Sequence, residues 1–144
     1  MTVTLAEFLL ARIAEEANVA RFPTSGYEPE AKADWVCPWT GGLDFGSDVI
    51  SVGDGPVATH MATWDPARVL IECEAKRRIV ELHHYEYPFS WVEKLDVPEQ
   101  PDKRVCSTCG DPDEARVPWP CRTLRFLALP YAAHPDYDPA WHPE

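Results

Sequence analysis

The stretch Cys106-Ser-Thr-Cys109-Gly110 decides how the C-terminal half of this chain folds. Two cysteines separated by two residues and followed by glycine are typical of a metal knuckle, which needs two more ligands to complete a tetrahedron. Cys121 and one histidine of the pair His83-His84 are the candidates. We therefore expect a structural zinc ion bound by Cys106, Cys109, Cys121 and His83.

Several alternatives to this ligand set stay open. His83 and His84 point about 100° apart on a helix, so only one of them can face the knuckle, and we prefer His83. Cys73 is a rival fourth ligand, but ten residues of helix, about 15 Å, separate it from His83, and a core position suits it better. The CxxC pair could also be a redox pair, although Gly110-Asp-Pro112 reads as a turn and not as a helix start. In the last alternative the cysteines form no site.

A zinc ion with four protein ligands has no open position for water or substrate, which argues against catalysis at the knuckle. Outside it, Cys37 has no basic or histidine partner nearby in the sequence, so a role as nucleophile is unsupported. We expect His60 to lie among strand residues, partly buried and hydrogen-bonded. The loop aspartates read as turn formers: Asp34, Asp44, Asp48 and Asp54. No phosphate-binding glycine loop, GxSxG or HExxH motif is present.

Composition sets the broad class. The 144 residues suit one folded domain, and ten of the 15 prolines lie from Pro88 onward, so this half needs support beyond hydrogen-bonded ladders. The net charge of −11 makes a general nucleic-acid binder improbable, since phosphate neutralisation needs surplus lysine and arginine. An odd count of five cysteines favours a reducing compartment, which predicts a cytoplasmic protein. Neither a signal peptide nor a membrane span is expected.

Local signals predict an α+β fold in a single domain over residues 1–144. Thr4 and Glu7 form a capping box at a helix start, Pro23 should end that helix, and Asp65-Pro66 begins another. The fold has three helices, with a small antiparallel β-meander between the first and second, and the zinc knuckle joins the second and third. The expected segments are a helix at 1–22, the meander at 35–61 (runs Trp35–Trp39, Asp48–Val52 and Pro56–Met61), a helix at 65–84, a loop with the knuckle at 85–118, a helix at 120–133 and a tail at 134–144.

Two segments resemble a known family. They are His60-Met-Ala-Thr-Trp-Asp-Pro-Ala-Arg-Val-Leu70, continued by Glu74-Ala-Lys-Arg-Arg-Ile-Val-Glu-Leu-His83, and Pro120-Cys-Arg-Thr-Leu-Arg-Phe-Leu-Ala-Leu-Pro-Tyr-Ala-Ala-His-Pro-Asp-Tyr137. Over nearly its whole length the chain is similar to the family called domain of unknown function 6221, found in actinobacteria and their phages.

The resemblance implies that a histidine after the second helix, a CxxC pair and a Pro-Cys before the third helix occur together. This supports the ligand set with three cysteines and one histidine, and it favours His83 over His84. It implies a small intracellular or phage-encoded accessory protein, and nothing about activity follows from it.

We expect a non-catalytic binding or adaptor module that acts on a protein partner, in regulation or in phage–host interplay, with the oligomeric state open. Two other classes are kept as alternatives. The first is an acidic nucleic-acid mimic that blocks a DNA-binding protein, because residues 1–64 hold nine acids and three bases. The second is a small metal-dependent hydrolase that uses His60 and the loop aspartates, which requires an open coordination position.

Overall fold

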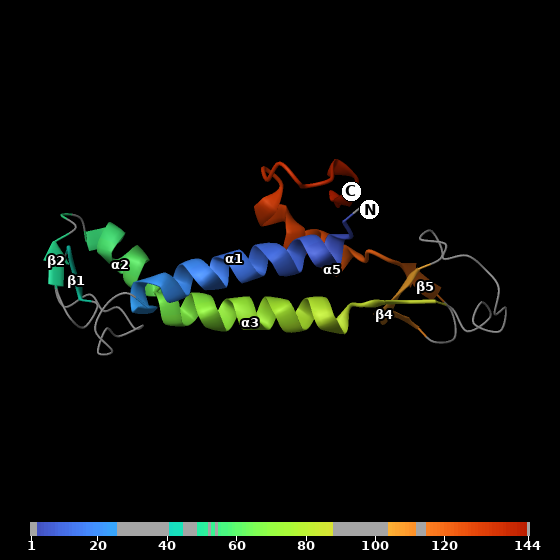
Figure 1. The fold of residues 1–144 in the computed structure, drawn as a ribbon, viewed down its shortest axis with the longest axis horizontal. Coiled ribbons are helices and arrows are strands. Elements are labelled where there is room, and N and C mark those ends of the chain that lie inside the picture. The colour runs from blue at the N-terminus through green and yellow to red at the C-terminus, as the bar shows by residue number, and fades with distance from the viewer. Residues whose placement is uncertain are drawn as a thin grey trace. The chain divides into compact units, whose positions relative to one another are not determined.

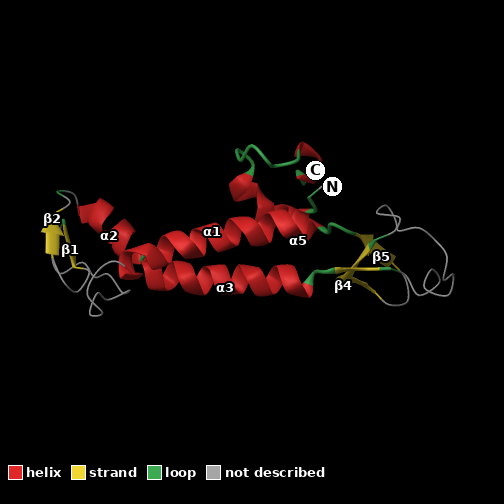
Figure 2. Cartoon of the chain, viewed as in Figure 1, coloured by secondary structure: helices red, strands yellow, loops and turns green. Residues whose placement is uncertain are grey.

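The computed structural model describes residues 3–25, 41–44, 49–51, 53, 55–87, 104–111 and 115–143 (Figures 1 and 2). Its helices are α1 (Leu5–Ser25), α2 (Gly55–Thr63), α3 (Pro66–Leu82) and α5 (Arg122–Ala128). Its strands are β1 (Gly42–Asp44), β2 (Val49–Ser51), β3 (Tyr85–Glu86), β4 (Val105–Asp111) and β5 (Ala115–Pro118). Two short 3₁₀ turns follow, η2 (Leu129–Tyr131) and η3 (Pro139–Trp141).

The fold mixes helices with small antiparallel sheets, as the sequence predicts, but the described residues contain four α-helices and not three. The additional helix is α2, and it covers Pro56–Met61, which we predicted as a strand. Pro56 is the second residue of α2, where its missing N–H costs no intrahelical hydrogen bond. Ala58 on the same helix is fully buried. The prediction failed because strand propensity is a weak signal that tertiary packing overrides.

The start of α1 is as predicted, whereas its end is not. The Thr4 N–H donates to Glu7 Oε2 at 2.8 Å, and the Glu7 N–H donates to Thr4 Oγ1 at 3.3 Å, which is a complete capping box. The helix then continues through Pro23 to Ser25. Because Pro23 lies in the last turn, its missing N–H interrupts only the end of the hydrogen-bond ladder. The buried side chains repeat at helical spacing: Leu5, Phe8, Leu9, Ile13, Ala17 and Ala20.

The chain forms two compact units, between which the residues of α1 and α3 are divided. The first, here called the hairpin unit, comprises Ile13–Ala75. In it, β1 and β2 form an antiparallel pair with Leu43 opposite Ile50. The predicted strand over residues 35–39 lies outside the described residues. The prediction of a single domain over residues 1–144 stays a prediction.

Helix α3 begins where the sequence predicts. The Arg68 N–H donates to Asp65 Oδ1 at 2.7 Å, which caps the first turn, and Pro66 is the first helical residue. In the hairpin unit α3 lies beside α1, and Cys73 Sγ is 3.9 Å from Glu16 Oε2 (Figure 1). None of the helices within the described ranges combines the length and apolar character that a bilayer crossing requires.

The second unit, here called the cysteine unit, comprises Met1–Arg12 and Lys76–Glu144. Strands β3, β4 and β5 form an antiparallel sheet in that order, which corrects our prediction of a loop over residues 85–118. Pro118 is the last residue of β5, an outer strand, where a residue without an N–H is tolerated. Residues 88–103 of the predicted loop lie outside the described residues.

The C-terminal helix is shorter than the predicted 120–133. Cys121 is the N-cap of α5 and not part of its first turn, and the α-helix ends at Ala128 before the η2 turn that contains Pro130. The tail packs its rings around one residue of α1. The rings of Tyr131, His134, Tyr137 and Trp141 lie 5.1–6.2 Å from the ring of Phe8. These rings therefore cover Phe8, which is buried in the cysteine unit.

Candidate metal centre

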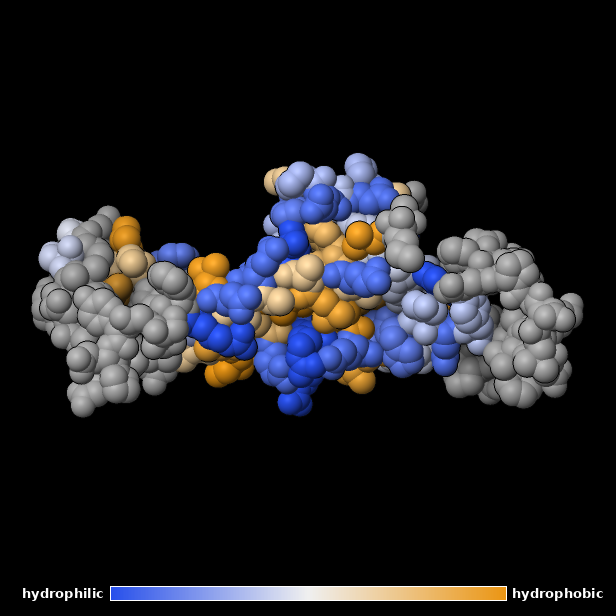
Figure 3. Space-filling view, in the orientation of Figure 1, coloured by the Kyte–Doolittle hydropathy of each residue, from blue (hydrophilic) through white to orange (hydrophobic). Residues whose placement is uncertain are grey.

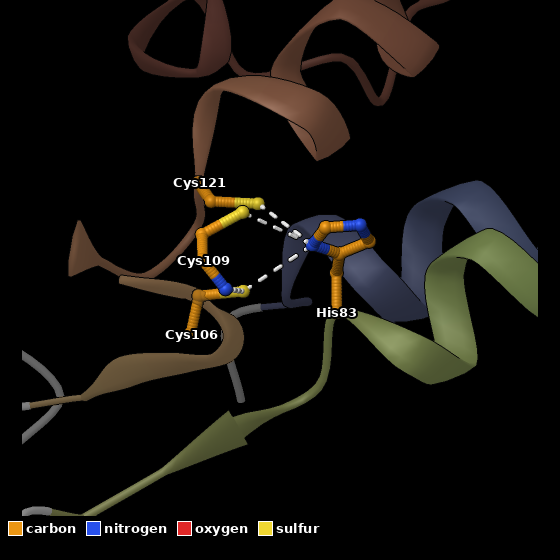
Figure 4. Close-up of side chains that lie close together, drawn as sticks. All are labelled: His83, Cys106, Cys109 and Cys121. Carbon is orange, nitrogen blue, oxygen red and sulfur yellow. Dashed lines mark hydrogen bonds between the residues drawn. The ribbon is translucent and has the colours of Figure 1, made fainter. Parts of the chain in front are cut away.

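Four side chains of the cysteine unit converge on one point (Figure 4). His83 directly follows α3, and its N–H still donates to the carbonyl of Ile79 at 3.1 Å. Cys106 and Cys109 lie on β4, and Cys121 precedes α5. Segments that are far apart in sequence thus supply one imidazole and three sulfurs.

The distances suit a single bound ion. The sulfurs of Cys109, Cys106 and Cys121 lie 3.3, 3.4 and 3.6 Å from Nδ1 of His83. All four donor atoms lie within 4.8 Å of one another. In a tetrahedral zinc site, bonds of about 2.3 Å to sulfur and 2.05 Å to nitrogen place those two atoms about 3.6 Å apart. The four side chains therefore have the chemistry and nearly the spacing of a tetrahedral metal site.

The irregular part of β4 places the sulfurs of both of its cysteines on the side of the strand that faces His83. Cys106 pairs with Tyr85 on β3, but the register with β5 shifts between Val105 and Gly110. In that segment the Cys109 N–H donates to Cys106 Sγ at 3.4 Å. We interpreted Gly110-Asp-Pro112 as a turn, but Gly110 and Asp111 still belong to β4, and Pro112 lies outside the described residues. A bulged strand, instead of a free turn, brings the two sulfurs together.

The end of α3 is tied to the cysteine segment through the two residues between the cysteines. The hydroxyl of Ser107 donates to the carbonyl oxygen of Leu82 at 3.0 Å, and the hydroxyl of Thr108 donates to the same oxygen. The Ser107 N–H donates to the carbonyl of His84 at 3.0 Å. These bonds satisfy carbonyl groups that a helix end leaves unpaired, and they hold His83 beside the sulfurs.

Trp119 holds the backbone of His83 from the other side. Its indole Nε1–H donates to the His83 carbonyl at 2.9 Å, and its ring meets that of Tyr85 edge to face at 5.2 Å. Sequence reasoning missed Trp119, Ser107 and Thr108. Their only sequence signal is their position beside the cysteines, because hydrogen bonds to a distant backbone leave no residue pattern.

The close approach of the sulfurs has an electrostatic consequence. Burial, together with hydrogen bonding to Cys106 and Cys121, raises the pKa of the Cys109 thiol to about 11. A thiol with this pKa is protonated at neutral pH, so a metal ion that binds there must displace the proton. A bound cation supplies the positive charge that stabilises neighbouring thiolates.

The other candidate ligands lie elsewhere. Nδ1 of His84 is 3.0 Å from the carbonyl oxygen of Glu81 and 3.2 Å from the hydroxyl of Ser107, so it is His83 that faces the sulfurs. Cys73 is buried on α3, as expected of a core residue, and does not belong to the cluster found among the described residues. Cys37 lies outside the described residues.

The residues considered for other chemistry gain no support. His60 is exposed on α2, which corrects the prediction of a partly buried strand residue, and its ring lies 6.5 Å from that of Trp64. Asp44 ends β1. The remaining loop aspartates, Asp34, Asp48 and Asp54, lie outside the described residues. So do Glu28 and Glu30, and the predicted acidic face of residues 1–64 therefore stays a prediction.

Comparison with known proteins places the chain in a family. No curated protein and no solved structure matches it. One family model matches residues 2–143, which is nearly the whole chain, and it is the family that the segments at His60–His83 and Pro120–Tyr137 resemble. The chain therefore belongs to the family of unknown function DUF6221.

Proposed function

We propose that His83, Cys106, Cys109 and Cys121 bind one structural Zn²⁺ ion, and that the chain is a non-catalytic module that binds a protein partner. The observation that carries the first part is the convergence of three sulfurs and one imidazole nitrogen within 4.8 Å. Zinc favours this combination of ligands. Four protein donors complete its tetrahedron and leave no position for substrate, which supports a structural role over hydrolysis.

The ion would act as a clip between three elements. His83 comes from the end of α3, two ligands come from β4, and Cys121 comes from the start of α5. A bond to each would fix the bulged sheet against both helices. Binding free energy at such a site becomes folding free energy, because the unfolded chain does not form it. A cytoplasmic location would keep the thiols reduced and available to zinc.

Elemental analysis of the purified protein tests the metal. We expect about one zinc per chain. His83→Ala and Cys106→Ser should lose the zinc and melt at a clearly lower temperature. The matched variants His84→Ala and Cys73→Ser change the same residue types outside the cluster, so both should retain zinc. Full zinc content in His83→Ala would contradict the proposed ligand set.

Exposed hydrophobic side chains support the second part, binding to a protein. Val3, Leu82 and Phe126 of the cysteine unit are 60%, 61% and 51% exposed. On the face drawn in Figure 3, hydrophobic residues of the described helices lie among hydrophilic ones. Aromatic residues are enriched in the buried centre of protein interfaces, so Phe126 is the candidate anchor.

Affinity capture from cell lysate tests this part. Zinc-loaded wild-type protein should recover a reproducible partner, and Phe126→Ser should recover much less of it while retaining zinc. The control is Leu129→Ser, a change of similar kind on the neighbouring η2 turn, where the side chain is less exposed. Capture of nothing reproducible by the wild-type protein would count against a protein-binding role.

A further inference from the structure

We propose that peroxide regulates this site: it oxidises Cys109, Cys106 closes a disulfide with it, and the zinc is released. This inference rests on the proposed zinc site. It assigns different tasks to the three sulfurs, and the assignment follows from their exposure and their hydrogen bonds.

The exposure of the sulfurs selects Cys109 as the one that peroxide reaches. Cys106 and Cys121 are buried, with 6% and 1% of each residue exposed, whereas Cys109 is half-buried. Oxidation of cysteine follows thiolate character and access to the oxidant. A bound zinc would hold all three sulfurs as thiolates, so access becomes the property that distinguishes them.

A hydrogen bond adds to this difference. Cys106 Sγ accepts the N–H of Cys109 at 3.4 Å, and this draws electron density from the Cys106 sulfur. Cys106 is thereby the weaker nucleophile towards a peroxide in solution. It is nevertheless placed to attack an oxidised neighbour, because the two sulfurs lie within 4.8 Å. Closing them to a disulfide bond of about 2.05 Å needs a shift of less than about 3 Å.

The chemistry proceeds in two steps. The Cys109 thiolate attacks one oxygen of hydrogen peroxide, the O–O bond breaks, and the departing hydroxide takes a proton to become water. The Cys106 thiolate then attacks the sulfenic sulfur of Cys109, an S–S bond forms, and the S–O bond breaks. The second hydroxide also takes a proton to become water. The two sulfurs lose two electrons, and the peroxide gains them.

After oxidation only Cys121 and His83 remain as donors, and two ligands hold zinc far more weakly than four. Loss of the ion would remove the metal-mediated link between the start of α5 and the end of α3. A dithiol reductant reverses the reaction by thiol–disulfide exchange and restores both thiolates. The site would therefore switch between a clipped and an unclipped form.

Peroxide titration of the zinc-loaded protein tests the proposal, with a chromogenic chelator to report released zinc. We expect release of about one zinc per chain, a Cys106–Cys109 disulfide in peptide mass maps, and rebinding after reduction. Zinc that stays bound in peroxide, or a disulfide that involves Cys121 or Cys73, would overturn the regulation alone. Purified protein that contains no zinc and takes none up would instead overturn the proposed function.

Two histidine substitutions separate the roles of the sulfurs, because each keeps four zinc-binding side chains. Cys109→His should slow zinc release by at least about tenfold, whereas Cys121→His should stay within about threefold of the wild-type rate. Equal slowing in both variants would refute the assignment of Cys109. A sulfenic-acid probe on the wild-type protein gives a second measurement that needs no variant. Under limiting peroxide, the label should appear first on Cys109.

Discussion

Both units bury hydrophobic side chains, but among the described residues the candidate metal ligands gather in the cysteine unit. In the hairpin unit, buried Leu43, Ala58 and Cys73 come from a strand pair and two helices, and no candidate metal cluster lies among its described residues. In the cysteine unit, the sulfurs of two cysteines on the irregular strand β4 lie close to the sulfur of Cys121 and the imidazole of His83. We therefore expect hydrophobic packing to stabilise the hairpin unit, and a metal ion at the four donor atoms to add to the stability of the cysteine unit.

Removal of the metal should have the largest effect, and it should fall on one unit. A strong chelator should lower the free energy of unfolding by at least about 4 kcal/mol, the linkage expected when free zinc exceeds its dissociation constant about a thousandfold. Hydrogen exchange should show loss of protection on β4 and α5, with β1, β2 and α2 little changed. Equal loss in both units would contradict the comparison.

A cavity in the hairpin unit should lower the free energy of unfolding without changing the zinc content. Leu43 is 1% exposed, and Leu43→Ala should lower the free energy of unfolding by about 3 kcal/mol because the packing cannot fill the space. Zinc content should be unchanged. Val57→Ala on α2 is the control, since Val57 is 46% exposed and its truncation should cost no more than about 0.5 kcal/mol. Zinc loss in Leu43→Ala would show that the two units depend on each other.

Trp119→Phe tests how the cysteine unit positions its histidine. The substitution removes the indole N–H that donates to the His83 carbonyl while it keeps an aromatic ring. Zinc affinity, measured by competition with a chelator, should fall about tenfold, as for the loss of other groups that orient metal ligands. Trp64→Phe in the hairpin unit should leave the affinity unchanged. Equal zinc affinities in the two variants would mean that Trp119 does not position His83 for zinc binding.

Zinc affinity and the stability of the metal-free cysteine unit should depend on pH in opposite directions. Because the pKa of Cys109 is raised to about 11, zinc must displace its proton, and this thiol alone makes the affinity rise about tenfold per pH unit around neutrality. In the metal-free protein, the raised pKa of Cys109 makes the free energy of unfolding smaller at alkaline pH. Between pH 9.0 and about 11 the thiol ionises in the unfolded chain before the folded one, so the free energy of unfolding falls as pH rises.

Competition titrations at pH values about one unit apart would measure the first effect, and chemical denaturation of the metal-free protein in alkaline buffers the second. Cys109→Ser should abolish the alkaline loss of stability in the metal-free protein. An affinity for zinc that does not change with pH would mean that Cys109 is not a ligand.

The starts of α1 and α3 were predictable because their signals are local. The hydrogen bonds between Thr4 and Glu7, and the cap that Asp65 gives to Arg68, join residues three positions apart. The run Pro56–Met61 was misread because its β-branched residues favour a strand, whereas in the fold the run is helical and buries Ala58. The strands β4 and β5 were missed because prolines nearby suggested a loop.

The sequence by itself determined the donor types, since the cysteine pair, Cys121 and the two adjacent histidines are visible as residues with metal-binding chemistry. Only the tertiary structure decided how they meet. The bulge in β4, the bonds of Ser107 and Thr108 to Leu82 and the indole of Trp119 turn His83 toward the sulfurs and leave His84 on Glu81. The physical reason is that ligand chemistry belongs to single side chains, whereas convergence within 4.8 Å depends on backbone contacts between distant segments.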